Sequence, residues 1–225
     1  MNPVAGGQPE VRRARPGDLF ALSWNTSLAL SRGRGARVRW WGRCRAVLML
    51  PILVLLFLMY IPAGDVITTV SRDAVLFLTE ARNPRKALQR AGSMTLVFLG
   101  ALVAFVLWLV AVTALGDAVQ LWVAVLGPLW FVVGLVCLAP SAGGSLYSAV
   151  EAVMTRPRGS YWVARPLASA PGAQWRGLDF AKAAIGAFVP VGAPVVATAA
   201  SKKMAVIYER FGFVRHKPGS LNLTR

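Results

Sequence analysis

Three long runs of apolar residues occupy the middle of the chain. They cover residues 46–62, 94–115 and 118–139, and the last two contain no charged side chain. Each of these two is near the roughly 20 residues that an α-helix needs to cross a bilayer. Gly116 and Asp117 separate them. We therefore predict an antiparallel transmembrane hairpin, because paired helices satisfy their backbone hydrogen bonds within lipid.

The first apolar run is shorter than the other two and contains Pro51. Its lack of charge favours a third crossing of the membrane, whereas its length and its proline favour a re-entrant or tilted segment. Lysine and arginine residues near both ends of the chain indicate that both termini are cytoplasmic. Two crossings agree with that orientation and three do not, so the sequence leaves the path of this run open.

Polar segments surround the predicted membrane region, residues 46–139. Residues 1–45 are rich in glycine, proline and arginine, and we expect a basic, partly disordered N-terminal region. Residues 140–160 are interpreted as a linker, and residues 161–225 as a small α/β unit. The predicted fold class is a mainly α-helical membrane protein, with a transmembrane hairpin, a further apolar segment and this C-terminal unit.

The stretch between the first two apolar runs, residues 65–92, has an amphipathic pattern. Apolar residues such as Ala74 and Phe77 share one face of a helix, and charged residues lie elsewhere. Asn83 is a candidate N-cap, and Pro84 is a candidate first residue of a basic helix that leads into the second run. We therefore expect helical structure throughout this stretch.

The composition agrees with a bilayer environment. Mean hydropathy is +0.55 and 56% of residues are hydrophobic, which is more than soluble domains usually contain. The net charge is +16 with only 9 acidic residues. Because the basic residues lie outside the apolar runs, the predicted partners are the lipid bilayer and anionic headgroups rather than nucleic acid. We expect a multi-pass protein of the cell membrane with a cytoplasmic C-terminal unit, which a protein partner or a second copy would bind.

The sequence argues against several kinds of function. Cys44 and Cys137 are far apart and His216 is the single histidine, so no metal site, disulfide spacing or Ser-His-Asp triad is expected. The second and third apolar runs contain no ionisable residue, whereas a pump or transporter normally carries some inside its spans.

The C-terminal unit alternates between strand-like and helix-like segments. Ser201 is a candidate N-cap for its second helix, and Gly212 fits the position just after that helix. The predicted order is β-α-β-α-β-β, with strands at 161–169, 193–199, 213–216 and 221–224 and helices at 180–188 and 202–210.

Three motifs in this unit carry a resemblance to a known family. Residues 167–171 read LASAP, Gln174-x-x-Gly177-x-Asp179 follows, and residues 200–213 end in YERFGF. In that order they resemble the C-terminal half of a GNAT-type (GCN5-related) N-acetyltransferase. The resemblance covers about 65 residues of the chain, and its last motif is the most specific.

The resemblance implies an acetyl-CoA site. The family binds the pyrophosphate with backbone N–H groups at a helix N-terminus, where the helix dipole favours an anion. By analogy, Ser201 would lie near the pantetheine, and Tyr208 would protonate the leaving thiolate as a general acid. The remaining cofactor-binding residues implied are Gln174, Arg176, Gly177, Leu178 and Asp179.

Two departures from the family bear on this prediction. Asp179 stands where the family has glycine or alanine, so its carboxylate would face the bound anion. Residues 12–22 resemble the family's first strand and helix, but membrane segments are expected where the rest of its N-terminal half, including the acceptor-side strands, would be.

Two functions therefore remain open. The first is a membrane-anchored, acetyl-CoA-dependent N-acyltransferase or acyl-CoA binder. The second is a non-enzymatic membrane protein whose degenerate GNAT-like tail serves as an interaction domain.

Overall fold

The computed structural model describes residues 9–31, 40–113, 117–138, 151, 154, 156–175, 177–199 and 201–225. Strands in these ranges form one mixed sheet rather than a separate C-terminal unit. Their bounds are β1 Val11–Arg13, β2 Val66–Thr69, β3 Ala74–Ala81, β4 Tyr161–Ser169, β5 Val195–Thr198, β6 Val214–Arg215 and β7 Asn222–Thr224. The order across the sheet is β1-β2-β3-β4-β5-β7-β6, so strands from both ends of the chain pair within it.

Among the described strands of this sheet, only one neighbouring pair is parallel. β1 to β4 are antiparallel to one another, β4 and β5 are parallel, and β5, β7 and β6 are again antiparallel. The parallel pairing ends early, at Ala164 and Ala197, whereas β4 continues along β3 to Ser169. The two strands therefore form a fork.

The expected amphipathic helix in residues 65–92 is wrong for its first half, which forms the β2–β3 hairpin. Every residue of β2 and the first six residues of β3 are buried, because helices cover both faces of the sheet. Arg72 adopts a φ of 62° in the connecting turn, and Thr69 Oγ1 donates a 2.6 Å hydrogen bond to Asp73. Burial on both faces removes the strict alternation that would have identified these strands.

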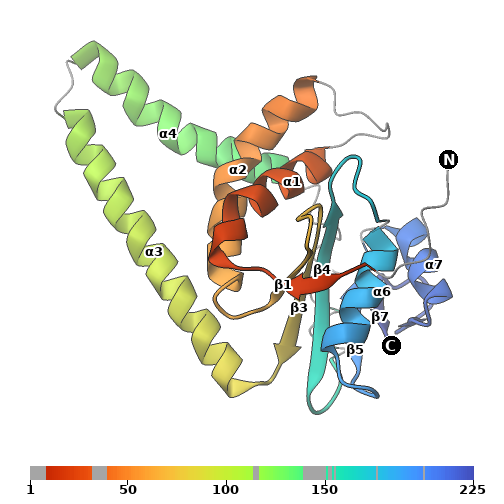
Figure 1. Cartoon of the computed structure of the whole chain (residues 1–225). Helices are drawn as coiled ribbons and strands as arrows, with labels where there is room; N and C mark the ends of the chain where they lie inside the picture. Colours follow the sequence, from red (N-terminus) through yellow and green to blue (C-terminus); the bar gives the residue numbers. More distant parts are fainter. Residues whose placement is uncertain are drawn as a thin grey trace.

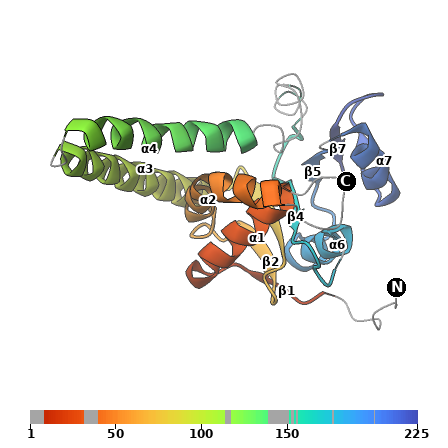
Figure 2. The same cartoon turned by 90° about the horizontal axis from the view of Figure 1, so that it is seen from above.

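Helices cover the two faces of the sheet separately. α1, Leu19–Ser31, and α2, Trp40–Tyr60, pack on one face, where Leu22, Met49, Leu53 and Phe57 contact Val75 and Phe77 of β3. α6, Gly177–Phe188, and α7, Lys202–Arg210, lie on the other face. Figure 2 shows α1 and α2 on one side of the strands and α6 on the other. A short 3-10 helix, Pro16–Asp18, precedes α1.

Two long apolar helices, α3 and α4, lie between β3 and β4 in the chain. α3 spans Pro84–Thr113 and α4 spans Asp117–Leu138. Asn83 caps α3 as predicted, because its Oδ1 accepts hydrogen bonds from the backbone N–H groups of Arg85 and Lys86. Ala81 and Tyr161 are paired at the ends of β3 and β4, so the residues between them interrupt what would otherwise be a simple hairpin.

The two helices contact opposite ends of α2. Ser93 Oγ of α3 donates a 2.7 Å hydrogen bond to the carbonyl of Met59, and Arg45 of α2 donates to the carbonyl of Cys137 on α4. The helices meet at their far ends and diverge toward α2 (Figure 1). This differs from the tightly paired antiparallel hairpin expected from the Gly116–Asp117 turn. Residues 114–116, and with them Gly116, lie outside the described part.

The predicted fold class is wrong. The chain forms a mixed α/β sheet with helices on both faces, in which the N-terminal residues also take part. Within the described residues, α2 and α3 are long and apolar enough to cross a membrane. In the most apolar stretch of α2, 22% of the residues are buried within the protein, against 6% for α3. The difference arises because one face of α2 packs on the sheet. The apolar run at 46–62 thus contributes to the core of the domain.

The secondary structure predicted for residues 161–225 is confirmed. Both helices and all four strands occur in the expected order. The helix at Lys202–Arg210 has the predicted bounds, and Ser201 caps it by accepting a hydrogen bond from the Met204 N–H. Gly212 follows the helix with a φ of 84°.

Candidate active site

A cleft begins where β4 and β5 separate. In an α/β sheet, ligands bind in crevices at the carboxyl ends of parallel strands where connections leave in different directions. β4 leads into α6 and β5 leads into α7, and the cleft lies between these two helices. Arg165 and Thr198 are the first residues beyond the Ala164–Ala197 pair, and both line the cleft.

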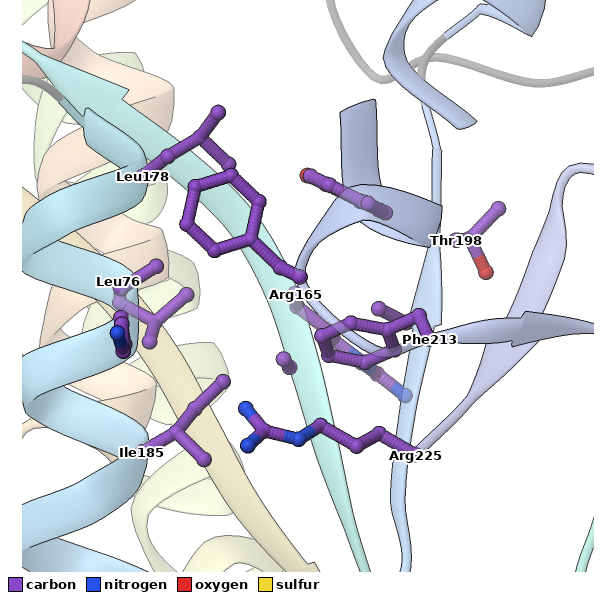
Figure 3. Close-up of a pocket in the computed structure, with 13 residues that line it drawn as sticks. Leu76, Arg165, Leu178, Ile185, Thr198, Phe213 and Arg225 are labelled. Carbon is purple, nitrogen blue, oxygen red and sulfur yellow. The ribbon is translucent and has the colours of Figure 1, made fainter. Parts of the chain in front are cut away.

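The walls of the cleft are mainly apolar, and the charged residues among its described lining are all basic. α6 contributes Leu178, Ala181, Lys182 and Ile185, at a spacing that places them along one side of a helix. Figure 3 shows Leu178 and Ile185 on one side, Phe213 on the other, and the guanidinium of Arg225 between them. The cavity volume is about 60 Å³, more than the roughly 10–15 Å³ that a single water requires.

Tyr208 of α7 lines the same cleft. Its ring packs against Phe213, with ring centroids 5.8 Å apart. Burial raises the pKa of the Tyr208 phenol above its ordinary value, so the hydroxyl stays protonated at neutral pH. Among the described residues, none forms a hydrogen bond with this hydroxyl. The phenol is therefore available to a bound molecule.

The loop between β4 and α6 is held by the β2–β3 turn. The backbone N–H of Gln174 donates a 3.1 Å hydrogen bond to Asp73 Oδ2, and the Ala170 N–H donates to the Asp73 carbonyl at 2.6 Å. Burial opposes ionisation of Asp73, but hydrogen bonds from Thr69 and the Gln174 N–H outweigh it and lower the pKa of Asp73. This ionised carboxylate accepts the hydrogen bond that the Gln174 N–H would otherwise offer to a ligand.

On the face covered by α1 and α2, the fork is bordered by Arg165 and by Tyr60 of α2. Ala164 belongs to the clusters under α6 and α7. Arg165, the next residue, borders the cleft at the fork, but its side chain is directed to the opposite face. Its Nη1 lies 3.3 Å from the hydroxyl of Tyr60 on α2. Tyr60 in turn packs edge-on against Phe77, with ring centroids 5.4 Å apart.

A polar network follows the other strand of the fork on that same face. Thr198 Oγ1 donates a 2.8 Å hydrogen bond to Asn222 Oδ1, and Asn222 Nδ2 donates to Glu151 Oε2 at 3.0 Å. Ser220 Oγ donates to the same Glu151 oxygen at 2.8 Å, and Lys217 Nζ lies 3.7 Å from Oε1. The hydrogen bond from Ser220 is the main cause of a lowered pKa at Glu151, so this carboxylate is ionised at neutral pH.

The structure brings together two of the residues predicted from sequence. Leu178 and Tyr208 line the cleft. Gly177 begins α6 and Asp179 lies exposed in its first turn. Ser201 caps α7, and Gln174 is bound to Asp73 as described above. Arg176 lies outside the described residues.

Sequence reasoning missed the basic residues and the second face of the fork. The missed lining residues with polar or charged side chains are Arg165, Lys182, Thr198 and Arg225. Alternation along the predicted strand at 161–169 would have placed Arg165 on one face. The role of that face depends on which helix covers it, and no local pattern shows that. The described residues contain no cluster of His, Cys, Asp and Glu that could bind a metal ion.

Comparisons with known proteins add little beyond this geometry. No family model matches the chain, and no curated protein sequence is significantly similar to it. Among solved structures, the chain is similar to the "Crystal structure of mosquito arylalkylamine N-Acetyltransferase like 5b", with 11% sequence identity, a TM-score of 0.36, and coverage of 95% of this chain and 96% of that one. At that TM-score the likeness transfers no residue roles.

Proposed function

We propose that this chain is a membrane-anchored N-acyltransferase that takes its acyl group from acyl-CoA. The observation that carries the proposal is the meeting of Leu178 and Tyr208 in a cleft that begins where β4 leaves β5. The GNAT resemblance assigned these two residues to one site from motifs 30 positions apart (178 to 208). A fork between parallel strands gives a thioester access to both faces of the sheet.

The charge of the cleft supports an anionic ligand. Lys182 and Arg225 line it, and no acidic residue is among its described lining residues. The first turn of α6 adds the positive end of a helix dipole beside Leu178. We assign the phosphates of acyl-CoA to this end, with Lys182 and Arg225 as their cationic partners and the apolar stripe of α6 along the pantetheine. The N–H of Gln174 would take part only if Asp73 moved away.

Transfer to an amine needs one proton to move from nitrogen to sulfur. The amine nitrogen attacks the thioester carbonyl carbon, a C–N bond forms, the C–S bond breaks, and the acyl group leaves the thiol. The nitrogen loses one proton and the sulfur gains one, so the step balances and Tyr208 stays protonated throughout. Because burial raises the pKa of Tyr208 from 10.0, the phenol is a weaker acid than a thiol near 8.5. We therefore assign it a hydrogen bond to sulfur that strengthens as negative charge develops.

The apolar surface of α3 supports the anchor. α3 has 30 residues, a length of about 45 Å, and exposes large apolar side chains along most of it. These include Leu88 at 75%, Leu96 at 71%, Phe98 at 67% and Val110 at 61% of their full accessible surface. Because α2 packs on the sheet, α3 and α4 are the segments assigned to the bilayer. Two crossings return the chain to the side on which it started, which agrees with a cytoplasmic sheet.

Calorimetry of acetyl-CoA against the full chain in detergent tests the acyl-CoA site. We expect saturable binding that weakens about tenfold in Lys182→Gln, because a cationic hydrogen-bond partner is lost. Lys203→Gln is the matched control, since Lys203 lies exposed on α7 and does not line the cleft. If the folded chain does not bind acetyl-CoA, the enzymatic proposal fails and the interaction-domain alternative is favoured.

Carbonate extraction of membranes tests the anchor. The wild-type chain should remain in the membrane pellet, and Leu99→Lys combined with Val103→Lys on α3 should release it, because each charge within the bilayer costs about 2.5–3.5 kcal/mol. Val214→Lys is the control, since Val214 is 70% exposed on β6. Release of the wild-type chain would contradict the anchor.

A further inference from the structure

Arg165 is placed to bind an anion at the fork. It is the first residue of β4 beyond the last pair with β5, and it is exposed. A guanidinium carries five N–H donors, and the Tyr60 hydroxyl at 3.3 Å uses one of them. No carboxylate of the described residues lies within 4.0 Å of its nitrogens, whereas Arg12, Arg72, Arg90 and Arg215 each have such a partner.

The position of Arg165 separates it from the acyl-CoA side of the cleft. Leu178 and Tyr208 come from α6 and α7 on one face, while Tyr60, which holds Arg165, belongs to α2 on the other. In the proposed reaction the thioester lies at the fork with its CoA toward α6 and α7. An amine that attacks the carbonyl from behind would therefore approach along the face of Tyr60 and Arg165.

The two strands of the fork carry different polar groups on that face. Arg165 stands on β4, and Thr198 on β5 leads through Asn222 to the ionised Glu151. Arginine binds carboxylate and phosphate groups with two parallel hydrogen bonds, which fixes the orientation of the bound molecule. A cationic amine with no anionic group would gain nothing from Arg165 and would be repelled by it.

We propose that the acceptor is an amine that also carries a carboxylate or phosphate group, and that Arg165 binds this group while the nitrogen is directed toward the fork. This inference rests on the proposed acyltransferase function. Tyr60 is then a positioning residue, because its hydroxyl holds the guanidinium on the acceptor face. The same chemistry is offered by a soluble aminoalkyl phosphate and by the headgroup of an aminophospholipid in the membrane.

A matched pair of acceptors tests the proposal. Phosphoethanolamine and ethanolamine differ only in the phosphate, and thiol release from acetyl-CoA by the full chain in detergent measures the transfer to each. We expect the wild type to prefer phosphoethanolamine, and Arg165→Met to lower the ratio of the two kcat/KM values at least tenfold. Arg165→Lys keeps the charge but cannot donate two parallel hydrogen bonds, so it should recover only part of that ratio. Arg158→Met is the control, since Arg158 is exposed and does not line the cleft.

The Arg165→Met variant decides the inference. An unchanged ratio in Arg165→Met overturns it, provided that the variant still transfers to ethanolamine. Weaker acetyl-CoA binding by Arg165→Met in calorimetry also overturns it, because Arg165 would then belong to the acyl-CoA side. Absence of acetyl-CoA binding by the wild type is instead the failure of the proposed function itself.

The source of the anion is distinguished by a third acceptor. If phosphatidylethanolamine in mixed micelles is acylated and this activity depends on Arg165, the anion is a lipid headgroup. If only phosphoethanolamine reacts, the bound anion is the phosphate group of a soluble acceptor. If neither anionic amine is preferred over ethanolamine by the wild type, the proposal is wrong.

Discussion

Gly134 on α4 lies directly against the backbone carbonyl of Leu48 on α2. A Cβ at this glycine would overlap that oxygen and come within 2.9 Å of Ile52 Cδ1. The contact lies near the point where Arg45 donates to the Cys137 carbonyl. The missing side chain thus allows the C-terminal half of α4 to pack on the helix that covers the sheet.

Gly134→Ala should weaken this packing by about 1–3 kcal/mol, because the new methyl group meets backbone rather than a flexible side chain. The measurement is the free energy of unfolding of the full chain in detergent. Gly100→Ala is the matched control, since no atom of the described residues beyond its own turns of helix lies within 4 Å of the position of its Cβ and alanine favours a helix over glycine. Equal effects of the two substitutions would contradict the close contact.

The ion pair of Asp65 and Arg90 joins the start of β2 to the base of α3. Arg90 Nε lies 3.4 Å from Asp65 Oδ2, and Asp65 is fully buried. Burial raises the pKa of Asp65, and the cations that oppose this are Arg90, Lys86, Arg13 and Arg165. Because the folded pKa lies above the unfolded value, ionisation of Asp65 reduces stability as the pH rises above 3.8 toward and past the folded pKa.

Arg90→Met should therefore destabilise the chain by about 3–5 kcal/mol at pH 7, because it leaves a buried charge without its nearest partner. The loss should shrink as the pH is lowered and Asp65 becomes protonated. Asp65→Asn combined with Arg90→Met should recover much of the stability and remove this part of the pH dependence. A double variant as unstable as Arg90→Met alone would show that the arginine acts by packing, and equilibrium denaturation at several pH values measures the difference.

The pKa of Asp18 is shifted in the opposite direction from that of Asp65. Its carboxylate lies 2.7 Å from both Arg12 Nη1 and Arg72 Nε, and the hydrogen bond from Arg12 is the main cause that lowers its pKa from 3.8 to about 2. A lowered folded pKa contributes stability that is present above 3.8 and lost as the pH falls through about 2.

Asp18→Asn should cost about 1–2 kcal/mol at pH 7 and almost nothing near pH 2, given about 1.4 kcal/mol for each pKa unit and screening at the half-exposed Arg72. Glu10→Gln is the control, because Glu10 is exposed and has no ion pair with another described residue. A pH-independent loss in Asp18→Asn would mean that the side chain acts only through its neutral hydrogen bond to the Arg15 N–H.

Tyr208→Phe should lower kcat for acyl transfer about 100-fold, as expected for loss of a hydrogen-bond donor to the charge that develops on sulfur, with little change in the affinity for acetyl-CoA. The ring remains to pack against Phe213, so kcat should fall while the affinity for acetyl-CoA is kept. Because burial raises the pKa of Tyr208, wild-type kcat should not fall from ionisation of this group below about pH 10. Tyr161→Phe, at a buried position outside the cleft, is the control. Equal kcat values for wild type and Tyr208→Phe would remove Tyr208 from the mechanism.

The C-terminal elements could be predicted from sequence because local chemistry determines them. Ser201 can accept the first free N–H of its helix, Gly212 can adopt a positive φ, and the apolar positions of residues 202–210 fall on one side. The β2–β3 hairpin was misread as a helix because both faces of its strands are buried, so apolar residues such as Val75, Leu76 and Phe77 follow one another without alternation.

The sequence by itself determined that two long uncharged segments exist, and the motifs that follow them predicted that Leu178 and Tyr208 lie in one site. It could not show that α2 is a core helix, since the same apolar residues suit a bilayer and the face of a sheet. It also could not show that Val11 and Asn222 belong to one sheet, or that Arg165 and Tyr60 meet at the fork. Pairings between residues that are far apart in the chain depend on which surfaces become buried together, and burial is a property of the whole fold.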